Sequence, residues 1–145
     1  MELREATRQD LPVVLALLAD AGEERAEVTE AHEQALAAIG ADPRNEMLVL
    51  ADGEAVVGCL QLTYIPGLGQ GGRERALVEA VRIREDRRGG GLGAVLMRLA
   101  VERARGRGCA LVQLTSNKRR SAAHRFYERL GFARSHEGFK LRLDG

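Results

Sequence analysis

Residues 81–96 read V-R-I-R-E-D-R-R-G-G-G-L-G-A-V-L, and this stretch decides the fold. Residues 77–84 have the period-2 pattern of a β-strand, and from Leu92 the apolar residues recur with the period of a helix that buries one face. Arg88–Gly93 forms a glycine loop between the two. Because glycines let a ligand approach main-chain N–H groups and a helix start adds unpaired donors, this order of elements is typical of a phosphate-binding loop.

The loop fits neither of two common phosphate-binding patterns. The P-loop requires Lys followed by Ser or Thr, and the dinucleotide pattern G-x-G-x-x-G requires two residues before its last glycine. The pattern present is [Q/R]-x-x-G-x-[G/A], which occupies Arg88–Gly93 directly after the V-R-I strand end. It resembles the pyrophosphate loop of the GNAT superfamily of acetyl-CoA-dependent N-acetyltransferases. Taken alone, the loop could also be a structural turn between strand and helix.

A second stretch carries the same resemblance. Residues 115–132 read T-S-N-K-R-R-S-A-A-H-R-F-Y-E-R-L-G-F, which is similar to the GNAT signature N-x-x-A-x-x-F-Y-x-x-x-G-F, with a longer spacing after Asn117. The resemblance implies an α+β fold over a single domain, residues 1–145. We expect a GNAT-like three-layer domain with about four helices and a twisted, mixed, mostly antiparallel sheet of about six or seven strands, including a parallel pair at the central βαβ unit.

Local patterns predict the other elements. In the first half they are a strand at Glu2–Arg8, a helix from the cap Asp10 to Gly22, a helix from the cap Thr29 to Gly40, and a hairpin of 47–51 and 55–64 turning at Asp52-Gly53. In the second half they are a connecting loop at Pro66–Gly72, a helix from Leu92 to about Arg105, a strand at Cys109–Thr115 buried on both faces, a helix ending at Gly131, and a closing hairpin of 132–135 and 139–143.

Composition excludes several classes of protein. The chain of 145 residues has no run of 18 apolar residues and no signal peptide, and its two cysteines lie in apolar runs, so we expect a reduced cytoplasmic protein without a membrane span or metal site. Residues 1–72 hold 4 Lys and Arg against 13 Asp and Glu, a balance of −9, whereas residues 73–145 hold 18 against 8, a balance of +10. The basic half would attract a polyanionic cofactor if the halves are separate in space. An aromatic content of 3% argues against nucleic-acid binding.

Glu79 is the candidate general base. It interrupts the row formed by Leu77, Val81 and Ile83, and if this row faces the core, its carboxylate is partly desolvated. Desolvation raises a carboxyl pKa and makes the group a better proton acceptor near neutral pH. The alternatives are a structural carboxylate paired with an arginine, Arg82 or Arg125, or a solvent-facing residue at the strand end.

The resemblance implies the other roles. The main chain of Val81, Arg82 and Ile83 would bind the pantetheine arm, an N–H near Val81 would polarise the thioester carbonyl, and the pyrophosphate would be held by Arg88, Gly89, Gly90, Gly91, Leu92 and Gly93. Tyr127 matches the tyrosine that protonates the coenzyme A thiolate, with a core aromatic as the alternative. Asn117 matches a cofactor-contacting asparagine, with a turn or helix cap as the alternative.

The function expected from these features is acetyl transfer from acetyl-CoA to a primary amine, directly and in a ternary complex. The acceptor is either a small molecule or a protein N-terminus, and the alternative is a non-catalytic module that binds coenzyme A. Homodimer formation is a further expectation from the resemblance. The acidic residues Glu23–Glu33, the Pro66–Gly72 loop and His136 are candidates for the acceptor side.

Overall fold

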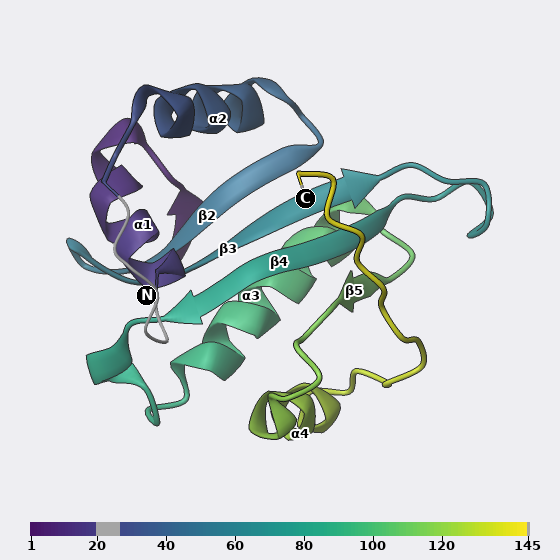
Figure 1. The fold of residues 1–145 in the computed structure, drawn as a ribbon. Coiled ribbons are helices and arrows are strands. Elements are labelled where there is room, and N and C mark those ends of the chain that lie inside the picture. The colour runs from purple at the N-terminus through teal and green to yellow at the C-terminus, as the bar shows by residue number, and fades with distance from the viewer. Residues whose placement is uncertain (20–26, 145) are drawn as a thin grey trace. The chain divides into compact units, whose positions relative to one another are not determined.

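The computed structural model describes residues 1–19 and 27–144, and the chain divides into two compact units, Met1–Gln113 and Leu114–Gly145. The first unit contains, in chain order, β1 (Glu2–Glu5), the 3-10 turn η1 (Arg8–Asp10), α1 (Leu11–Leu18), α2 (Glu30–Ala41), β2 (Asn45–Asp52), β3 (Ala55–Ile65), β4 (Arg75–Ile83), the 3-10 turn η2 (Glu85–Arg87) and α3 (Leu92–Arg107) (Figure 1). A short strand, β5 (Val112–Leu114), ends at the first residue of the second unit, which contains α4 (Ser121–Arg129). The predicted single domain stays a prediction.

The strands form one sheet in the order β1-β2-β3-β4-β5. The strands β1 to β4 are antiparallel to their neighbours. Beside β4, the Ala76 N–H donates to the Leu111 carbonyl (2.9 Å) and the Ala110 N–H donates to the Glu74 carbonyl (2.8 Å), so the chain runs in the same direction along both segments. The predicted mixed, mostly antiparallel sheet with a parallel pair around α3 is confirmed, with five strands in the described residues instead of six or seven.

Both faces of the sheet are covered in the first unit. On one face, side chains of α1 and the strands form a buried cluster of Val14, Leu17, Met47, Val49, Val56 and Cys59. Strand residues alternate between faces, so the fully buried Leu48, Leu50, Leu60 and Leu62 point to the opposite face, on which α3 lies (Figure 1). Burial of each such leucine contributes about 2 kcal/mol, so these positions define the core.

Several predicted boundaries are confirmed. Thr29 caps α2, because its hydroxyl accepts a hydrogen bond from the His32 N–H (3.4 Å). The β2–β3 hairpin turns at Gly53, whose φ of 61° favours glycine. Gly108 ends α3 with a φ of 89°. The predicted end of α1 at Gly22 lies outside the described residues.

Two predictions at the end of the chain are wrong. The strand predicted at Cys109–Thr115 is only Val112–Leu114, and it is not buried on both faces, because Gln113 is exposed. The closing hairpin is absent, since residues 132–144 contain no strand. The apolar members of its period-2 pattern are 86–93% exposed, at Phe139, Leu141 and Leu143. A strand pattern requires a surface to pack against, and in the structure nothing covers these side chains.

Asp10 occupies the N-cap position of α1, as predicted, but its side chain makes no capping hydrogen bond to that helix. Its carboxylate accepts two hydrogen bonds from Arg4 (2.8 and 3.1 Å), one from the Thr7 N–H (2.7 Å) and one from the Thr7 hydroxyl (3.1 Å). The side chain of Asp10 is buried. The Arg4 hydrogen bonds, and then the Thr7 hydrogen bonds, together lower its pKa to about 2 against the opposing effect of burial. The Arg4–Asp10 pair therefore ties β1 to the start of α1.

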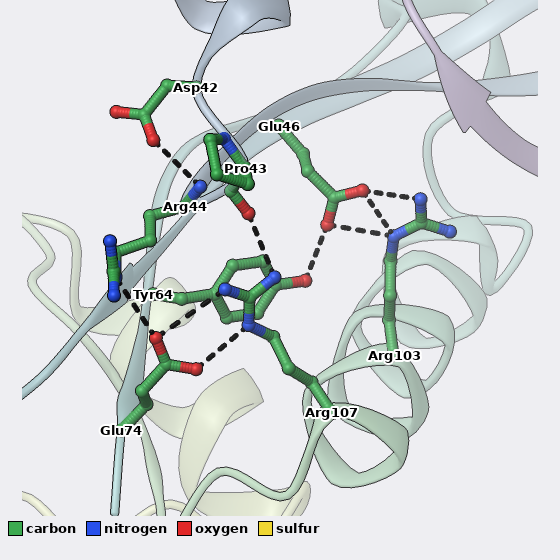
Figure 2. Close-up of polar contacts among 8 residues, drawn as sticks. All are labelled: Asp42, Pro43, Arg44, Glu46, Tyr64, Glu74, Arg103 and Arg107. Carbon is green, nitrogen blue, oxygen red and sulfur yellow. Dashed lines mark hydrogen bonds and ion pairs between the residues drawn. The ribbon is translucent and has the colours of Figure 1, made fainter.

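An ionic cluster fastens α3 to the sheet (Figure 2). The buried Tyr64 of β3 donates its hydroxyl to Glu46 of β2 (2.5 Å), and Arg103 of α3 holds the same carboxylate through Nε and Nη2 (2.5–3.1 Å). Burial alone would raise the pKa of Glu46, but the Arg103 and Tyr64 hydrogen bonds lower it. Burial, and then the hydrogen bond to Glu46, raise the pKa of Tyr64. The tyrosine is therefore a neutral donor to a charged acceptor.

A second arginine of α3 completes the cluster. The Arg107 guanidinium lies over the Tyr64 ring, 4.0 Å from its centroid, which is the geometry of a cation–π contact. Arg107 also donates to Glu74 (2.9 Å) and to the Pro43 carbonyl (2.9 Å), and Arg44 pairs with Glu74 (3.4 Å) (Figure 2). The last two turns of α3 are thus fixed to β2, β3 and the start of β4.

The Arg4–Asp10 pair predicts a pH dependence of stability. A carboxyl pKa that is lower in the folded chain contributes stability above the unfolded pKa near 3.8 and loses it as the pH falls through the folded value near 2. We expect the free energy of unfolding to fall by about 2 kcal/mol from this group between pH 4 and pH 2. Asp10→Asn should lose a similar amount at pH 7 and show a flatter profile in that window, measured by urea unfolding.

The control for this prediction is Asp144→Asn, at an exposed position near the C-terminus. It should match the wild type at pH 7. Equal slopes between pH 4 and pH 2 for the wild type and Asp10→Asn would contradict the assignment.

Candidate active site

The site is built around a β-bulge in β4. The register pairs Cys59 with Arg82 and Gln61 with Glu79, so two residues of β4, Ala80 and Val81, lie opposite a single residue of β3. Ala80 has a φ of 55°, a left-handed conformation that costs a residue other than glycine about 1–3 kcal/mol. The register gives neither Ala80 nor Val81 a Cα partner on β3, so the regular alternation of β4 is interrupted at these two residues.

The bulge changes which residues share a face. Paired residues on neighbouring strands lie on the same face, so Glu79 and Arg82 lie on the face of Gln61 and Cys59, towards α1. Ile83 pairs with Gly58 and lies on the opposite face. The predicted single row of residues 77, 79, 81 and 83 is therefore wrong, because an extra residue resets the alternation.

Glu79 is exposed, so the partial desolvation expected from the sequence is also wrong. Its carboxylate has no hydrogen bond or ion pair within the described part of the first unit, where the alternative of a structural pair with Arg82 is not realised. Its carboxylate is accessible to an incoming molecule. Whether Glu79 is the base stays a prediction.

Two residues of β3 support the bulge. A Cβ on Gly58 would lie 2.9 Å from the Arg82 carbonyl oxygen and 2.9 Å from Ile83 Cδ1, so only glycine allows the two strands to approach. The buried thiol of Cys59 donates to the Ala80 carbonyl (3.6 Å). Burial raises the pKa of Cys59 to about 12, which keeps the thiol protonated and able to donate. An isolated glycine inside a strand, such as Gly58, is a sequence signal that could have predicted a bulge or a close approach of the backbone here.

The glycine loop has the geometry of an anion cradle. Gly89 and Gly91 have φ values of 82° and 81°, and a Cβ at either would meet no atom within 4 Å. Gly91 begins α3, no side chain caps this 16-residue helix, and its first turn carries no acidic residue. Arg88 donates its Nε to the Ile83 carbonyl (3.2 Å). Unpaired N–H groups at a helix start, next to an arginine and open glycines, suit a pyrophosphate.

The second unit holds the other two predicted residues. The ring of Tyr127 on α4 is half-buried and packs edge-on against Phe126 (5.2 Å between centroids) and Phe132 (6.0 Å). The side-chain oxygen of Asn117 accepts from the Arg119 N–H (3.0 Å), which forms a local turn. Tyr127 is therefore a packed aromatic residue and Asn117 forms a turn, as the alternative interpretations expected. The roles of both residues in contacting the cofactor stay predictions. His136 Nδ1 forms a hydrogen bond with the Ser135 hydroxyl (2.6 Å).

Comparison with known proteins identifies the family. The family model of the acetyltransferase (GNAT) family matches residues 11–132. The chain belongs to the GNAT family. It is therefore an acetyl-transferring enzyme of the N-acetyltransferase type. Both stretches that carry the resemblance, the glycine loop and residues 115–132, lie inside the matched region.

Individual relatives agree with this assignment. The aminoalkylphosphonate N-acetyltransferase of Salmonella typhimurium is 34% identical over 143 residues, 98% of this chain and 91% of that protein. Among solved structures, a transcriptional regulator from Bacillus halodurans is 42% identical with a TM-score of 0.92, covering 98% of this chain and 99% of its own. An acetyltransferase from Trypanosoma brucei is 28% identical with a TM-score of 0.83 and the same coverage.

Within the described residues, no group of three or more His, Cys, Asp or Glu side chains could hold a metal ion. None of the helices described is both long enough and apolar enough to cross a bilayer.

The left-handed conformation of Ala80 gives a test of the bulge. Valine favours strands, but a β-branched residue at positive φ is strongly strained. Ala80→Val should therefore lower the free energy of unfolding by about 1–3 kcal/mol, whereas Ala80→Gly should stay within about 1 kcal/mol of the wild type because relief of strain offsets its chain entropy. Thermal and urea unfolding measure both. Stabilisation by valine would show that β4 is regular.

Proposed function

We propose that the enzyme transfers the acetyl group of acetyl-CoA to the primary amine of a small molecule, by direct transfer in a ternary complex. The observation that supports this most is the arrangement in the first unit, where the β-bulge at Ala80 and Val81 is followed, just after the end of β4, by the open glycine loop at the start of α3. The near full-length relative that acetylates aminoalkylphosphonates favours a small acceptor over a protein N-terminus. Aminoalkylphosphonates are the first acceptors to test.

The residues of the loop fit coenzyme A. The main-chain N–H groups of Gly89–Gly93 and the guanidinium of Arg88 would hold the pyrophosphate, and the open space at Gly89 and Gly91 lets it approach the backbone. The main chain of Val81–Ile83 and the side-chain amide of Asn117 would bind the pantetheine arm. Bound acetyl-CoA supplies the acetyl group as an activated thioester. No metal is required for this reaction.

In the proposed reaction the amine nitrogen forms a bond to the acetyl carbon while the carbon–sulfur bond breaks. The carboxylate of Glu79 accepts the proton of the amine, either directly or through water, and the hydroxyl of Tyr127 gives a proton to the departing thiolate. The N–H of Val81 would stabilise the negative charge that develops on the carbonyl oxygen. The Tyr127 ring packs edge-on against Phe126 and Phe132, and these contacts help to position it.

The first test concerns the glycine loop. Gly91→Val should weaken acetyl-CoA binding at least about tenfold, because the side chain blocks approach to the backbone. Gly108→Val is a matched control, since Gly108 lies at the other end of α3 with a similar φ of 89° and open space around it. Acetyl-CoA at 100 times its dissociation constant should stabilise the wild type and the control by about 2.7 kcal/mol in thermal unfolding. If acetyl-CoA stabilised Gly91→Val as much as the wild type, the glycine loop would not be part of the acetyl-CoA site.

The second test concerns the two proton-transfer residues. Glu79→Gln should lower kcat by about 10²–10⁴-fold, as expected for loss of a positioned base. Tyr127→Phe keeps the packed ring and should lower kcat by about tenfold or more. Thiol release from acetyl-CoA with a panel of amines measures both.

The control is Glu54→Gln, an exposed carboxylate in the β2–β3 turn, which should keep wild-type rates. Unchanged rates in the Glu79 and Tyr127 variants would reject their roles. Tight acetyl-CoA binding without turnover of any amine by the wild type would instead identify a non-catalytic coenzyme A-binding module.

A further inference from the structure

We propose that the side chain of Arg82 binds an anionic group of the acceptor, so that the enzyme selects small zwitterionic amines, with a phosphonate as the favoured anion. This inference rests on the proposed function and adds the class of substrate. The sequence assigned Arg82 only a main-chain contact with the pantetheine arm. A side-chain role is compatible with that contact, because the two involve different atoms.

The bulge is the first step of the argument. In a regular strand, residues three apart point to opposite faces, so Glu79 and Arg82 would be separated by the sheet. The extra residue at Ala80–Val81 brings both to the face of α1, opposite Gln61 and Cys59. These two partners are two residues apart along β3, a span of about 7 Å. An acidic and a basic side chain therefore project from neighbouring places on one face.

The state of the guanidinium is the second step. Arg82 is half-buried, and Nη1 donates to the neighbouring Val81 carbonyl (2.9 Å). It has no carboxylate partner in the part of the chain that the structure describes, unlike Arg84, which pairs with Asp86 (2.6 Å), and Arg87, which pairs with Asp52 (2.9 Å). A partly desolvated charge without a counterion gains from binding an anion. The remaining N–H donors can form the two-pronged contact that arginine makes with phosphonate or carboxylate oxygens.

The chemistry of the acceptor is the third step. A short molecule with an amine at one end and an anion at the other matches the Glu79–Arg82 pair, because Glu79 attracts the ammonium group and takes its proton while Arg82 holds the anion. An uncharged alkylamine satisfies only Glu79. Aminoalkylphosphonates have both groups on a short carbon chain, in agreement with the name of the Salmonella relative.

The experiment compares acceptors across variants. Steady-state kcat/KM is measured for aminoethylphosphonate, β-alanine and propylamine, with the wild type, Arg82→Gln and Arg82→Lys. Arg82→Gln should lower kcat/KM for aminoethylphosphonate by about 10–100-fold, mainly through KM, because a charge-assisted contact is lost. The value for propylamine should change less than about threefold, within the range of ordinary surface substitutions. Arg82→Lys should restore part of the loss, because it keeps the charge without the planar fork.

Arg75→Gln is the matched control. Arg75 lies in the same strand and is half-buried like Arg82, and it likewise lacks a carboxylate partner among the residues described. It precedes Glu79 by four residues, about 13 Å along the strand. It should leave the preference for aminoethylphosphonate over propylamine unchanged. The KM for acetyl-CoA should be the same in all variants, which separates acceptor binding from cofactor binding.

Each outcome decides the proposal. An equal loss for charged and uncharged amines in Arg82→Gln, or a raised KM for acetyl-CoA, would overturn it and make Arg82 a structural or cofactor residue. A preference for β-alanine would keep Arg82 as the anion site but reject the phosphonate. If the wild type turns over no amine, the proposed function fails, and calorimetric titration of aminoethylphosphonate into the wild type and Arg82→Gln still tests the anion site. Equal binding, or none, would overturn it.

Discussion

One extra residue in β4 is the constraint on which the site depends. The left-handed Ala80 interrupts the regular pairing of β4 with β3 over two residues, Ala80 and Val81, at a local cost in backbone strain. Gly58 allows the close approach of the strands beyond the bulge, and the Cys59 thiol satisfies the Ala80 carbonyl. A strained residue persists only where its surroundings hold it, and here the surroundings are two adjacent residues of the neighbouring strand. Strain and support therefore form one unit, next to the Val81 N–H that we propose as the donor to the thioester carbonyl.

The glycine loop is held from the far end of its helix. The N-terminus of α3 presents open glycines, whereas its last two turns are tied to the sheet through Glu46, Tyr64 and Glu74 (Figure 2). A donor array stabilises a ligand best when binding does not have to order it first. Arg103 and Arg107 lie on α3, about three and four helical turns from the loop. They fix α3 at the end opposite the glycine loop, so the ionic cluster belongs to the fold and not to the proposed cofactor site.

The sequence predicted those features whose cause is local. The glycine loop, the start of α3, the Thr29 cap and the Asp52-Gly53 turn each have their signal within a few residues. The features that it missed depend on distant partners. Asp10 is a good cap by type, but Arg4 and Thr7 hold its carboxylate instead. Alanine gives no indication of a positive φ, so the bulge and the faces of the residues beyond it were not predictable from β4 alone. The C-terminal residues alternate like a strand, but alternation cannot show that a covering surface exists.

Some charged side chains form ion pairs that stabilise the fold, whereas others remain available to a ligand. The acidic and basic halves of the sequence are not separate in space, because Arg103 pairs with Glu46 and Arg87 with Asp52 across the two halves. The overall asymmetry therefore gives no broad potential that could sort an anionic cofactor from a cationic amine. Discrimination has to come from individual charges that the fold leaves without partners. Among the described residues of β4, Glu79 and Arg82 are two such charges, and the bulge places them near each other on one face. The exposure of Glu79, which weakens the argument from desolvation, supports this interpretation, because an accessible carboxylate can meet an ammonium group directly.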